Sequence, residues 1–553
     1  MNSSRYNKNQ YSNVAAACFF IIFFCFGTFT IKDYGISIDE EFQRSSGFYW
    51  LNYLLNFTPF TDLNAQVAEK YIITSDFFRP DIISFYGIIF DVPLAFLEVI
   101  LNIEETKNYF HLRHYFNFLI FFVSAIYFYK LINDRFSNAH INLIGTLFYV
   151  LSPRIYGSSF YNNKDILFLS LLTITFYYAF KCLSKFSYKN LIIFSLLSAF
   201  CTSTRIIGIF IPISFTIIFF FLVFTNWKRI DYVIKIIFYL LLYCVFLIMH
   251  WPYLWESPIS NFTLFLSSTS DYLIKIKLFF SGDYISSNNL PYSYIPIWIG
   301  ITTPFIHLFF FILGFIFFFL RLFKRFLKID NSKVYNNLWR GLKEKKDFYI
   351  FLYFFPIIVY LISFNVTLYN GWRHIYFLNI FLVYFATYGY YILISNTIFK
   401  RKKIFIKLFT YTFLIFVIFK MFIYHPYQNI YFNSFIFNNY KNKFDVDYQG
   451  LSGLNFLNLI LSLEKNNNKI NLGVASFYAL ERSMSLLNEE DKKRFNFVGQ
   501  EYKRADYIYT NNISEVDKNN NDKYNIPTNF EQIHQLVVDG VIIYRVYKNN
   551  SKL

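Results

Sequence analysis

Long apolar runs separated by short polar segments fill this chain up to about residue 424. A helix needs about 20 apolar residues to cross the hydrocarbon core of a bilayer, so runs of this length predict transmembrane helices. The runs are 14–31, 82–103, 113–133, 138–152, 165–183, 190–204, 207–225, 232–249, 296–320, 348–366, 374–396 and 404–424. The pattern therefore predicts an α-helical polytopic membrane protein.

Basic residues between the runs predict which runs cross the membrane. Lys and Arg favour cytoplasmic linkers, and here they gather in the N-terminus and in 181–189, 228–235, 321–346 and 400–407. If every run crossed, five crossings would separate the cytoplasmic N-terminus from 181–189 and would place this basic segment outside. One of these five runs is therefore expected not to cross. The run 82–103 carries Asp91 and Glu98, and carboxylates at bilayer depth are costly, so we predict an interfacial helix on the outer face. About eleven transmembrane helices remain, with a cytoplasmic N-terminus.

This threading also predicts the external segments and the domains. A first external loop spans 32–112 and includes the interfacial helix. Further external loops are 153–164, 250–295 and 367–373. We expect a transmembrane module over 1–440 and a small extracytoplasmic α/β domain over 441–553. In the latter, strand-like stretches at 470–474, 507–509 and 541–546 alternate with helix-like stretches at 451–464 and 478–493.

Composition supports a membrane protein and excludes two other classes. Hydrophobic residues make up 55% of the chain and charged residues 16%, against about 25% charged in soluble domains. The net charge of +17 would suggest nucleic acid in a soluble protein. Here the basic residues lie between apolar runs, so no nucleic acid partner is expected. The five cysteines lack CxxC spacing, which argues against a disulfide framework or a zinc site.

Acidic residues of the outer loops are the first candidates for chemistry. Asp39 and Glu40 follow the first apolar run, and Asp165 stands in a parallel position at the start of a later helix. A carboxylate at the membrane surface can take a proton from an acceptor. The alternative is that Asp39 and Glu40 are solvated loop acids and that Asp165 complements a helix dipole.

Cations on the same outer face are candidates for binding a phosphate, because the positive-inside rule predicts few of them there. Guanidinium groups bind phosphate in a bidentate way. Ion pairing with carboxylates or snorkelling to headgroups is the alternative. The candidates are Arg79, Arg154, Lys164, Arg205 and Arg373, with His374 beside the last of them.

The sequence contains no complete set of metal ligands. Asp39 and Asp165 supply a partial set of hard oxygen ligands, so a divalent cation such as Mg²⁺ or Mn²⁺ is possible. No HExxH, glycine-rich phosphate loop or GxSxG motif is present.

Several short motifs of the chain resemble those of the polytopic GT-C glycosyltransferases, a class that includes protein O-mannosyltransferases and the lipid A aminoarabinose transferase. The nearest likeness is to bacterial family-39-type proteins. The motifs are SIDE at 37–40, SPR at 152–154, NKD at 163–165, TRIIG at 204–208, WPYLW at 251–255, LPYSYIP at 290–296, TTP at 302–304, NGWRH at 370–374 and HPY at 425–427.

The resemblance implies a function and assigns roles. It implies that Asp39 is the first-loop catalytic acid and that Asp165 is the second-loop acid. Arg79 stands where the aminoarabinose transferase has a lysine that serves the lipid phosphate. The implied enzyme of the bacterial inner membrane moves a sugar from a polyprenyl-phosphate donor to a lipid, glycan or protein acceptor, with Asp39 as general base and Glu40 assisting it or orienting the loop. The alternatives are a transporter or flippase for a lipid-linked solute, and a glycan ligase or polymerase.

Overall fold

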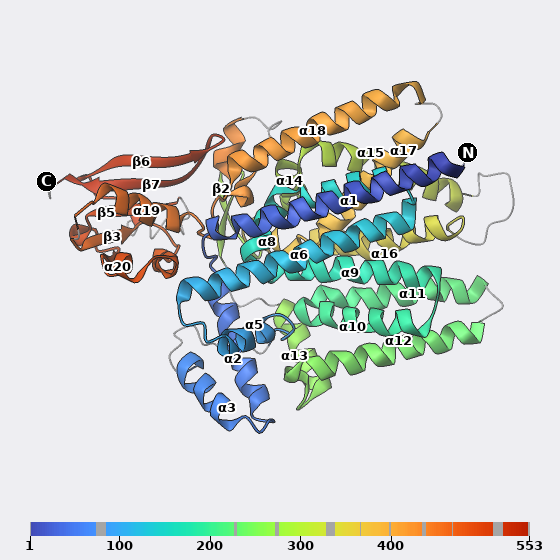
Figure 1. Ribbon diagram of the computed structural model, residues 1–553, viewed down its shortest axis with the longest axis horizontal. Coiled ribbons are helices and arrows are strands. Elements are labelled where there is room, and N and C mark those ends of the chain that lie inside the picture. The colour runs from blue at the N-terminus through green and yellow to red at the C-terminus, as the bar shows by residue number, and fades with distance from the viewer. Residues whose placement is uncertain are drawn as a thin grey trace.

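The computed structural model describes residues 2–72, 85–225, 229–270, 276–327, 338–364, 366–396, 400–433, 438–466, 468–511 and 524–550. This part of the chain forms a bundle of long helices with a small sheet domain at one end (Figure 1). The predicted polytopic α-helical fold with a small C-terminal α/β domain is confirmed.

Most of the predicted crossings are long apolar helices. In the described part, eight helices are long and apolar enough to span a membrane. They are α1 (Asn2–Thr30), α6 (Thr106–Phe136), α9 (Asp165–Ser184), α12 (Arg229–His250), α15 (Phe305–Phe326), α16 (Leu342–Ser363), α17 (Leu378–Ser395) and α18 (Lys403–Tyr424). The other predicted crossings correspond to α7 (Ala139–Val150), α10 (Tyr188–Thr204) and α11 (Phe210–Thr225), which have 12, 17 and 16 residues.

The predicted run 296–320 is divided into two helices. α14 (Tyr294–Thr302) ends before Pro304, and α15 begins after it. Proline disfavours the helical conformation of the residue before it, and Thr303 is indeed extended, with φ −92° and ψ 135°. The spanning helix of this region is therefore α15, and α14 remains beside the outer loops.

The acidic run 82–103 does not cross the bundle. Among its described residues only α5 (Asp91–Ile100) is helical, and 10 residues are too few to span a bilayer. α5 packs on α2 (Glu40–Leu55) at the end of the bundle that also carries the C-terminal domain (Figure 1). Glu98 accepts hydrogen bonds from Arg44 and Arg113, both at 2.8 Å. The carboxylate is therefore neutralised within the protein rather than by water.

Polar contacts place several basic linkers at one end of the bundle. Asp134 pairs with Lys181 at 3.4 Å and also with Lys346, and Arg135 donates to Asp347 at 2.6 Å. The start of α1, the ends of α11, α15 and α17 and the starts of α12, α16 and α18 lie at this same end, opposite the C-terminal domain (Figure 1). The alternation of sides is as predicted. That this end is cytoplasmic stays a prediction.

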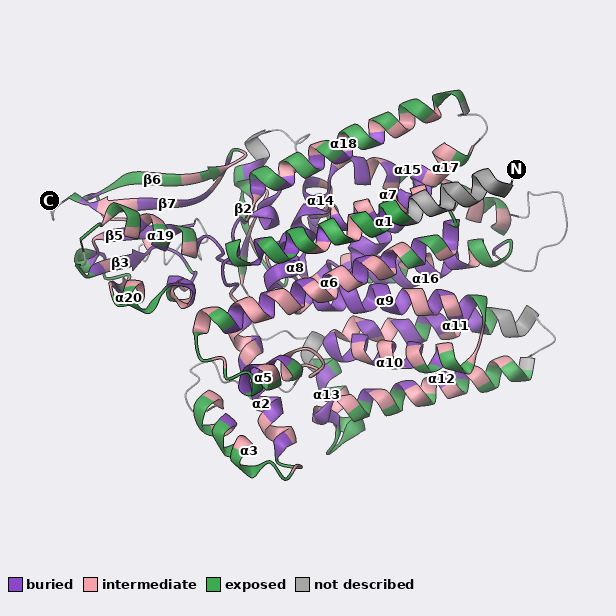
Figure 2. Cartoon of the chain, in the orientation of Figure 1, coloured by how far each residue is buried: buried purple, intermediate pink, exposed green. Residues whose placement is uncertain are grey.

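Burial separates central from peripheral helices. In the most apolar stretch of each helix, 83% of the residues are buried in α9, against 22% in α12 and in α18. Figure 2 shows α12 and α18 with long exposed faces, whereas α9 is almost entirely buried. Exposed apolar residues of a spanning helix are the ones that contact lipid, so α9 lies in the core of the bundle and α12 and α18 line its edge.

Short elements connect the long helices. They are η1 (Ile31–Asp33), α3 (Thr61–Val67), η2 (Ala68–Ile72), α8 (Pro153–Tyr161), η3 (Ile206–Ile209), η4 (Pro252–Leu254), α13 (Pro258–Ser270), β1 (Lys277–Phe280), β2 (Asp283–Ser286), η5 (Arg373–Ile375), η6 (Lys400–Lys402), η7 (Gln428–Ile430) and η8 (Asn438–Lys443). β1 and β2 form an antiparallel hairpin within the predicted third external loop.

The C-terminal domain is a mixed sheet with α19 (Gly453–Leu463). Its strands run in the order β4-β3-β5-β7-β6, with β3 parallel to β4 and β5, and with β7 antiparallel to β5 and β6. The strands are β3 (Ile470–Val474), β4 (Phe495–Gly499), β5 (Tyr507–Thr510), β6 (Phe530–Val538) and β7 (Val541–Asn549). The predicted helix 478–493 is divided into η9 (Leu480–Leu486) and α20 (Glu489–Lys492), because the backbone of Asn488 between them is extended. A further short helix, η10 (Tyr502–Arg504), follows β4.

The turn between β6 and β7 docks this domain on the bundle. Asp539 in that turn accepts hydrogen bonds from Lys420 at 2.8 Å and from Tyr424 at 2.9 Å, both on α18. Lys441 donates to the same carboxylate at 3.1 Å. Farther along, Arg482 donates to the carbonyl of Ile38 at 2.6 Å. The domain is therefore in direct contact with the loop that carries Asp39.

Candidate active site

Two of the predicted carboxylates join one cluster of positive charge at the domain end of the bundle. Asp39 caps α2 and accepts a hydrogen bond from Nη1 of Arg373, the first residue of η5. Asp165 begins α9 and accepts from Nη2 of Arg205, which ends α10. Lys164 adjoins Asp165. The motifs around these residues, far apart in sequence, therefore meet at one place.

Exposure distinguishes the two carboxylates. The side chain of Asp39 is 44% exposed, whereas that of Asp165 is 4% exposed. The buried Asp165 is also fixed by Asn162, whose Nδ2 donates to Oδ2 at 2.9 Å and whose Oδ1 accepts from the Asp165 backbone N–H at 3.0 Å. An acceptor arriving from solvent can reach Asp39, and Asp165 instead holds Arg205 in place.

Several cationic donors of the cluster lack an acceptor within the described residues. Nε of Arg205 and Nε of Arg373 are buried without a hydrogen-bond partner. Lys164 lies over the ring of Tyr86 and makes no hydrogen bond or ion pair in the described part of the chain. Leaving a buried donor unsatisfied costs about 1–3 kcal/mol. An anionic oxygen placed between these groups would satisfy them, and phosphate has suitable geometry.

The cluster shifts the pKa values of its members. Burial raises the pKa of Asp39, but Arg373, Lys164 and Arg205 outweigh it, so the pKa is lowered from its ordinary value. Burial and the charge of Arg205 hold the pKa of Lys164 well below its ordinary value, against Asp165 and Asp39. Burial and the same cations hold the pKa of His374 well below its ordinary range. The imidazole is therefore neutral at pH 7, and Asp39 is ionised.

Glu40 points away from this cluster. Its Oε1 accepts from the backbone N–H of Ser37 at 2.6 Å, and its Oε2 contacts Nε2 of His114 at 2.8 Å. The residue is 3% exposed. These contacts tie the start of α2 to the preceding loop and to α6, which carries His114. Of the two roles considered for Glu40, the geometry favours orienting the loop.

Arg154 and Arg79 are not brought into the cluster. Arg154 lies over the rings of Trp298 and Phe432, at 5.2 and 5.0 Å from the ring centres, and its Nε donates to the carbonyl of Tyr431 at 3.0 Å. Within the described residues it pairs with neither carboxylate. Arg79 falls outside the described residues.

Two further residues belong near the site. Asn163 donates to Asp91 at 3.0 Å, and Asp91 and Lys164 line one small cavity. Burial raises the pKa of Asp91 to about 6, against the charges of Arg113 and Lys164. Tyr448 approaches from the C-terminal side, with its hydroxyl 3.4 Å from that of Tyr376. The sequence could have pointed to Asp91, because an acid within an apolar run needs a partner. No sequence pattern pointed to Tyr448.

The described residues do not fit a divalent cation. No group of three His, Cys, Asp or Glu side chains among them could hold a metal ion. The carboxylates of Asp39 and Asp165, which sequence reasoning considered as ligands, each bind an arginine. The positive charge of the site is supplied by cationic side chains.

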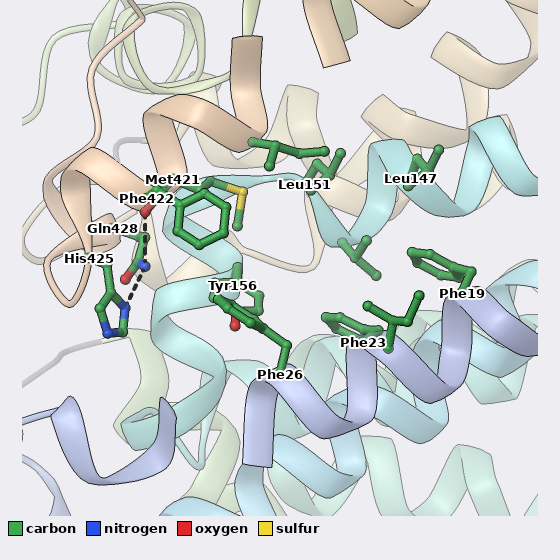
Figure 3. A pocket seen from close by; sticks show the side chains of 13 residues that line it. Phe19, Phe23, Phe26, Leu147, Leu151, Tyr156, Met421, Phe422, His425 and Gln428 are labelled. Carbon is green, nitrogen blue, oxygen red and sulfur yellow. Dashed lines mark hydrogen bonds between the residues drawn. The ribbon is translucent and has the colours of Figure 1, made fainter. Parts of the chain in front are cut away.

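A separate apolar cavity lies between α1, α7 and α18. Its volume is about 300 Å³. Phe19, Phe23 and Phe26 line it from α1, and Met421 and Phe422 from α18, as Figure 3 shows. Its polar edge is the pair Gln428 and His425, hydrogen-bonded at 3.1 Å. The lining suits a hydrocarbon chain, and none of the cluster residues contributes to it.

Comparison with known proteins supports the GT-C resemblance. Residues 94–255 match the family model described as dolichyl-phosphate-mannose-protein mannosyltransferase. The match contains Lys164, Asp165 and Arg205 and excludes Asp39, Arg373 and the C-terminal domain. No curated protein matches the chain. This part of the chain is therefore similar to membrane glycosyltransferases of the mannosyltransferase kind, and the eight candidate membrane spans of the described residues agree with that likeness.

Proposed function

We propose that the protein transfers a sugar from a polyprenyl-phosphate donor to an acceptor on the extracytoplasmic side of the bacterial inner membrane, with Asp39 as general base. The observation that carries this proposal is the position of Asp39. Its carboxylate is partly exposed and lies within a cluster of Arg373, Lys164 and Arg205. A base for the acceptor and cations for a phosphate are thus neighbours.

The donor phosphate would bind between the unsatisfied cationic groups. Nε of Arg205, Nε of Arg373 and Nζ of Lys164 supply donors that have no acceptor among the described residues. Ion pairs with a purely structural role would be expected to use their buried donors. The same cations would stabilise the charge that grows on the phosphate as the glycosidic bond breaks.

The transfer then needs one displacement. The acceptor oxygen or nitrogen attacks the anomeric carbon, and the bond from that carbon to the phosphate oxygen breaks. Its electron pair leaves with the polyprenyl phosphate. The proton of the acceptor passes to Asp39, a contribution of about 10²–10⁴-fold in rate. A single displacement inverts the anomeric configuration. The acceptor is a lipid, a glycan or a protein.

A donor-cleavage assay tests the proposal without knowledge of the acceptor. Full-length protein in lipid nanodiscs is given a mannosyl-phosphoryl polyprenol, with water in the place of the acceptor, and released polyprenyl phosphate is measured. We expect Asp39→Asn to lower the rate by about 10²–10⁴-fold.

Asp33→Asn is the matched control, because Asp33 lies in the same loop, is 50% exposed and pairs with His425 at 2.9 Å rather than with the cluster. It should retain wild-type cleavage. Wild-type cleavage by a folded Asp39→Asn variant would end the proposal.

A further inference from the structure

A second cavity lies between the C-terminal sheet and the hairpin β1–β2, apart from the cation cluster. Its volume is about 410 Å³, within the range of about 300–1,000 Å³ that is usual for small-molecule sites. Phe279 and Tyr284 line it from the hairpin, Phe444 and Asp445 from the linker before α19, and Thr510 and Arg545 from the sheet. Figure 1 shows β2 beside the end of the long β6–β7 hairpin.

Hydrogen bonds hold the walls of this cavity together. The backbone N–H of Asp445 donates to the carbonyl of Phe279 at 3.0 Å, and the N–H of Phe279 donates to Oδ1 of Asp445 at 3.2 Å. The N–H of Gly282 donates to the carbonyl of Lys443 at 2.9 Å. The linker thus pairs with the hairpin along its length, and the cavity has a fixed wall rather than a loose loop.

Asp445 brings an unused acceptor to the cavity. The residue is 8% exposed, and its Oδ2 is buried without a hydrogen-bond partner in the described part of the chain. An unsatisfied buried oxygen of this kind costs free energy that a ligand hydroxyl would recover.

Aromatic rings supply the other half of the lining. The rings of Phe279 and Tyr284 have centres 4.9 Å apart, and Phe444 faces the same space. A sugar ring has one face of C–H groups and a rim of hydroxyls. The rings suit the first, and Asp445 with the polar side chains of Thr510 and Asn442 suits the second. A hydrocarbon chain would leave Oδ2 of Asp445 without a hydrogen-bond partner.

The linker connects this cavity to the catalytic loop. Beyond Asp445 it continues to Tyr448, which contacts Tyr376 beside Arg373, and to Leu451. The carbonyl of Leu451 lies so close to Gly35 that a Cβ there would overlap it. Gly35 belongs to the loop that carries Asp39. One short segment, from Asp445 to Leu451, thus connects the cavity with the loop that carries Asp39.

We propose that this cavity binds a saccharide unit of the acceptor, remote from the group that receives the sugar, and so selects glycan-bearing acceptors. This inference rests on the proposed function, since it assigns a substrate class to that reaction. Binding energy from a remote part of a substrate can position the reacting group. The C-terminal domain then acts as a substrate-recognition element.

Saccharide binding by the full-length protein in nanodiscs tests the inference. The probes are methyl α-mannoside, methyl β-galactoside, N-acetylglucosamine and the β1,4-linked disaccharide of N-acetylglucosamine, followed by saturation-transfer difference NMR. We expect at least one of them to bind. Tyr284→Ala and Asp445→Asn should each weaken it about fivefold, because a lost ring contact or hydrogen bond of this kind is worth about 1 kcal/mol.

Phe477→Ala is the control, since Phe477 is a 49% exposed ring of the same domain that does not line the cavity. It should bind as the wild type does. If none of the four saccharides binds, or if binding survives in Tyr284→Ala and Asp445→Asn, the inference is overturned. A melting curve shows whether either variant has lost its fold. If one has, the other variant still tests the inference.

Donor cleavage with water separates the inference from the proposed function. The cavity variants should cleave the donor at the wild-type rate, and Asp39→Asn should bind saccharide normally while losing cleavage. If Asp39→Asn cleaves normally, the proposed function fails and the assignment of the saccharide to an acceptor fails with it. If cleavage behaves as expected but no saccharide binds, only the inference fails.

Discussion

At the scale of single residues, the charge on Asp39 depends on its neighbours. Arg373, Lys164 and Arg205 together outweigh the effect of burial on its pKa. This arrangement ensures that the base is ionised in the free protein, but a lowered pKa also makes it a weaker base. The phosphodiester of the donor would bring one negative charge beside the same three cations and so weaken their effect on Asp39. The pKa of Asp39 should therefore rise when the donor binds, at the moment when a stronger base is useful.

The pH dependence of donor cleavage checks this coupling. Asp39 must be ionised to accept a proton, so activity is present above its pKa and is lost as the pH falls through it. For kcat/KM, which reports the free enzyme, the acid limb should lie below about pH 4, the ordinary range of aspartate. For kcat, which reports the donor complex, the limb should lie at higher pH. Equal limbs in both profiles would contradict the coupling.

Lys164 provides a second test at this scale. Its ammonium lowers the pKa of Asp39 and is itself shifted well below its ordinary range. Lys164→Met should therefore raise the KM for the donor and move the acid limb of kcat/KM to higher pH. In the wild type, kcat/KM should also fall on the alkaline side well below about pH 10, the ordinary range of lysine, because the neutral amine no longer attracts phosphate.

The matched control is Lys492→Met, outside the cation cluster, where the lysine of the C-terminal domain contacts Glu489 and Thr106 at the start of α6. It should leave both limbs in place. If Lys164→Met changes the rate at every pH by one factor and moves no limb, Lys164 has only a structural role.

At the scale of elements, a buried ion cluster joins four helices at the end of the bundle opposite the candidate active site. Asp347 on α16 accepts hydrogen bonds from Arg135 on α6 at 2.6 and 2.7 Å, from Arg321 on α15 at 2.9 Å and from Tyr384 on α17 at 2.7 Å. Its side chain is fully buried. The pattern of apolar runs predicts the helices, but which charges meet between them depends on their rotation.

Asp347→Asn should destabilise the bundle by about 3–5 kcal/mol, because two arginines then lose their counter-ion in a buried place. The melting temperature of the protein in detergent measures this. Asp231→Asn is the control, since Asp231 is 50% exposed and pairs with Lys235 on the same helix, and such pairs contribute about 0.3–0.5 kcal/mol. Similar melting of the two variants would show that the cluster contributes little.

Close contact between α15 and α17 rests on two glycines. A Cβ at Gly389 would overlap the carbonyl of Phe310, and a Cβ at Gly314 would overlap that of Phe385. Small residues at helix crossings let backbones approach within a membrane. Gly389→Ala should therefore lower the melting temperature by several degrees, whereas Gly300→Ala on α14, where the Cβ meets nothing within 4 Å, should not. Equal melting of both variants would contradict this packing role.

At the scale of the whole molecule, the sequence predicts the individual helices better than the contacts between distant segments. Apolar runs and basic linkers predict the bundle and the alternation of its ends, because both signals are local. β6 was not predicted because its apolar residues Phe530, Ile533, Leu536, Val537 and Val538 do not alternate with polar ones as they do in a half-buried strand. For the site, the sequence predicted that Asp39, Asp165, Lys164 and Arg373 lie on the same side of the bundle, as they do. Tyr448 was not, since only the folded tail brings it there.

The docking of the C-terminal domain gives a final prediction. The Asp539 carboxylate binds Lys420 and Tyr424 on α18 as well as Lys441. Asp539→Ala removes these side-chain contacts at once and leaves the hydrogen bond from Lys441 to the Asp539 carbonyl. The domain also touches the catalytic loop through Arg482 and Leu451. Loosening it should therefore lower donor cleavage several-fold and increase proteolysis of the tail, while the transmembrane bundle keeps its melting temperature.

Glu531→Ala on β6 is the control, because Glu531 is exposed and contacts only the tail itself, through Asn550 at 3.1 Å. It should leave cleavage and proteolysis unchanged. Unchanged cleavage in Asp539→Ala despite rapid proteolysis would mean that the catalytic loop holds its shape without the domain. The contacts of Asp39 with Arg373 and of Glu40 with Ser37 and His114 would then suffice to order the site.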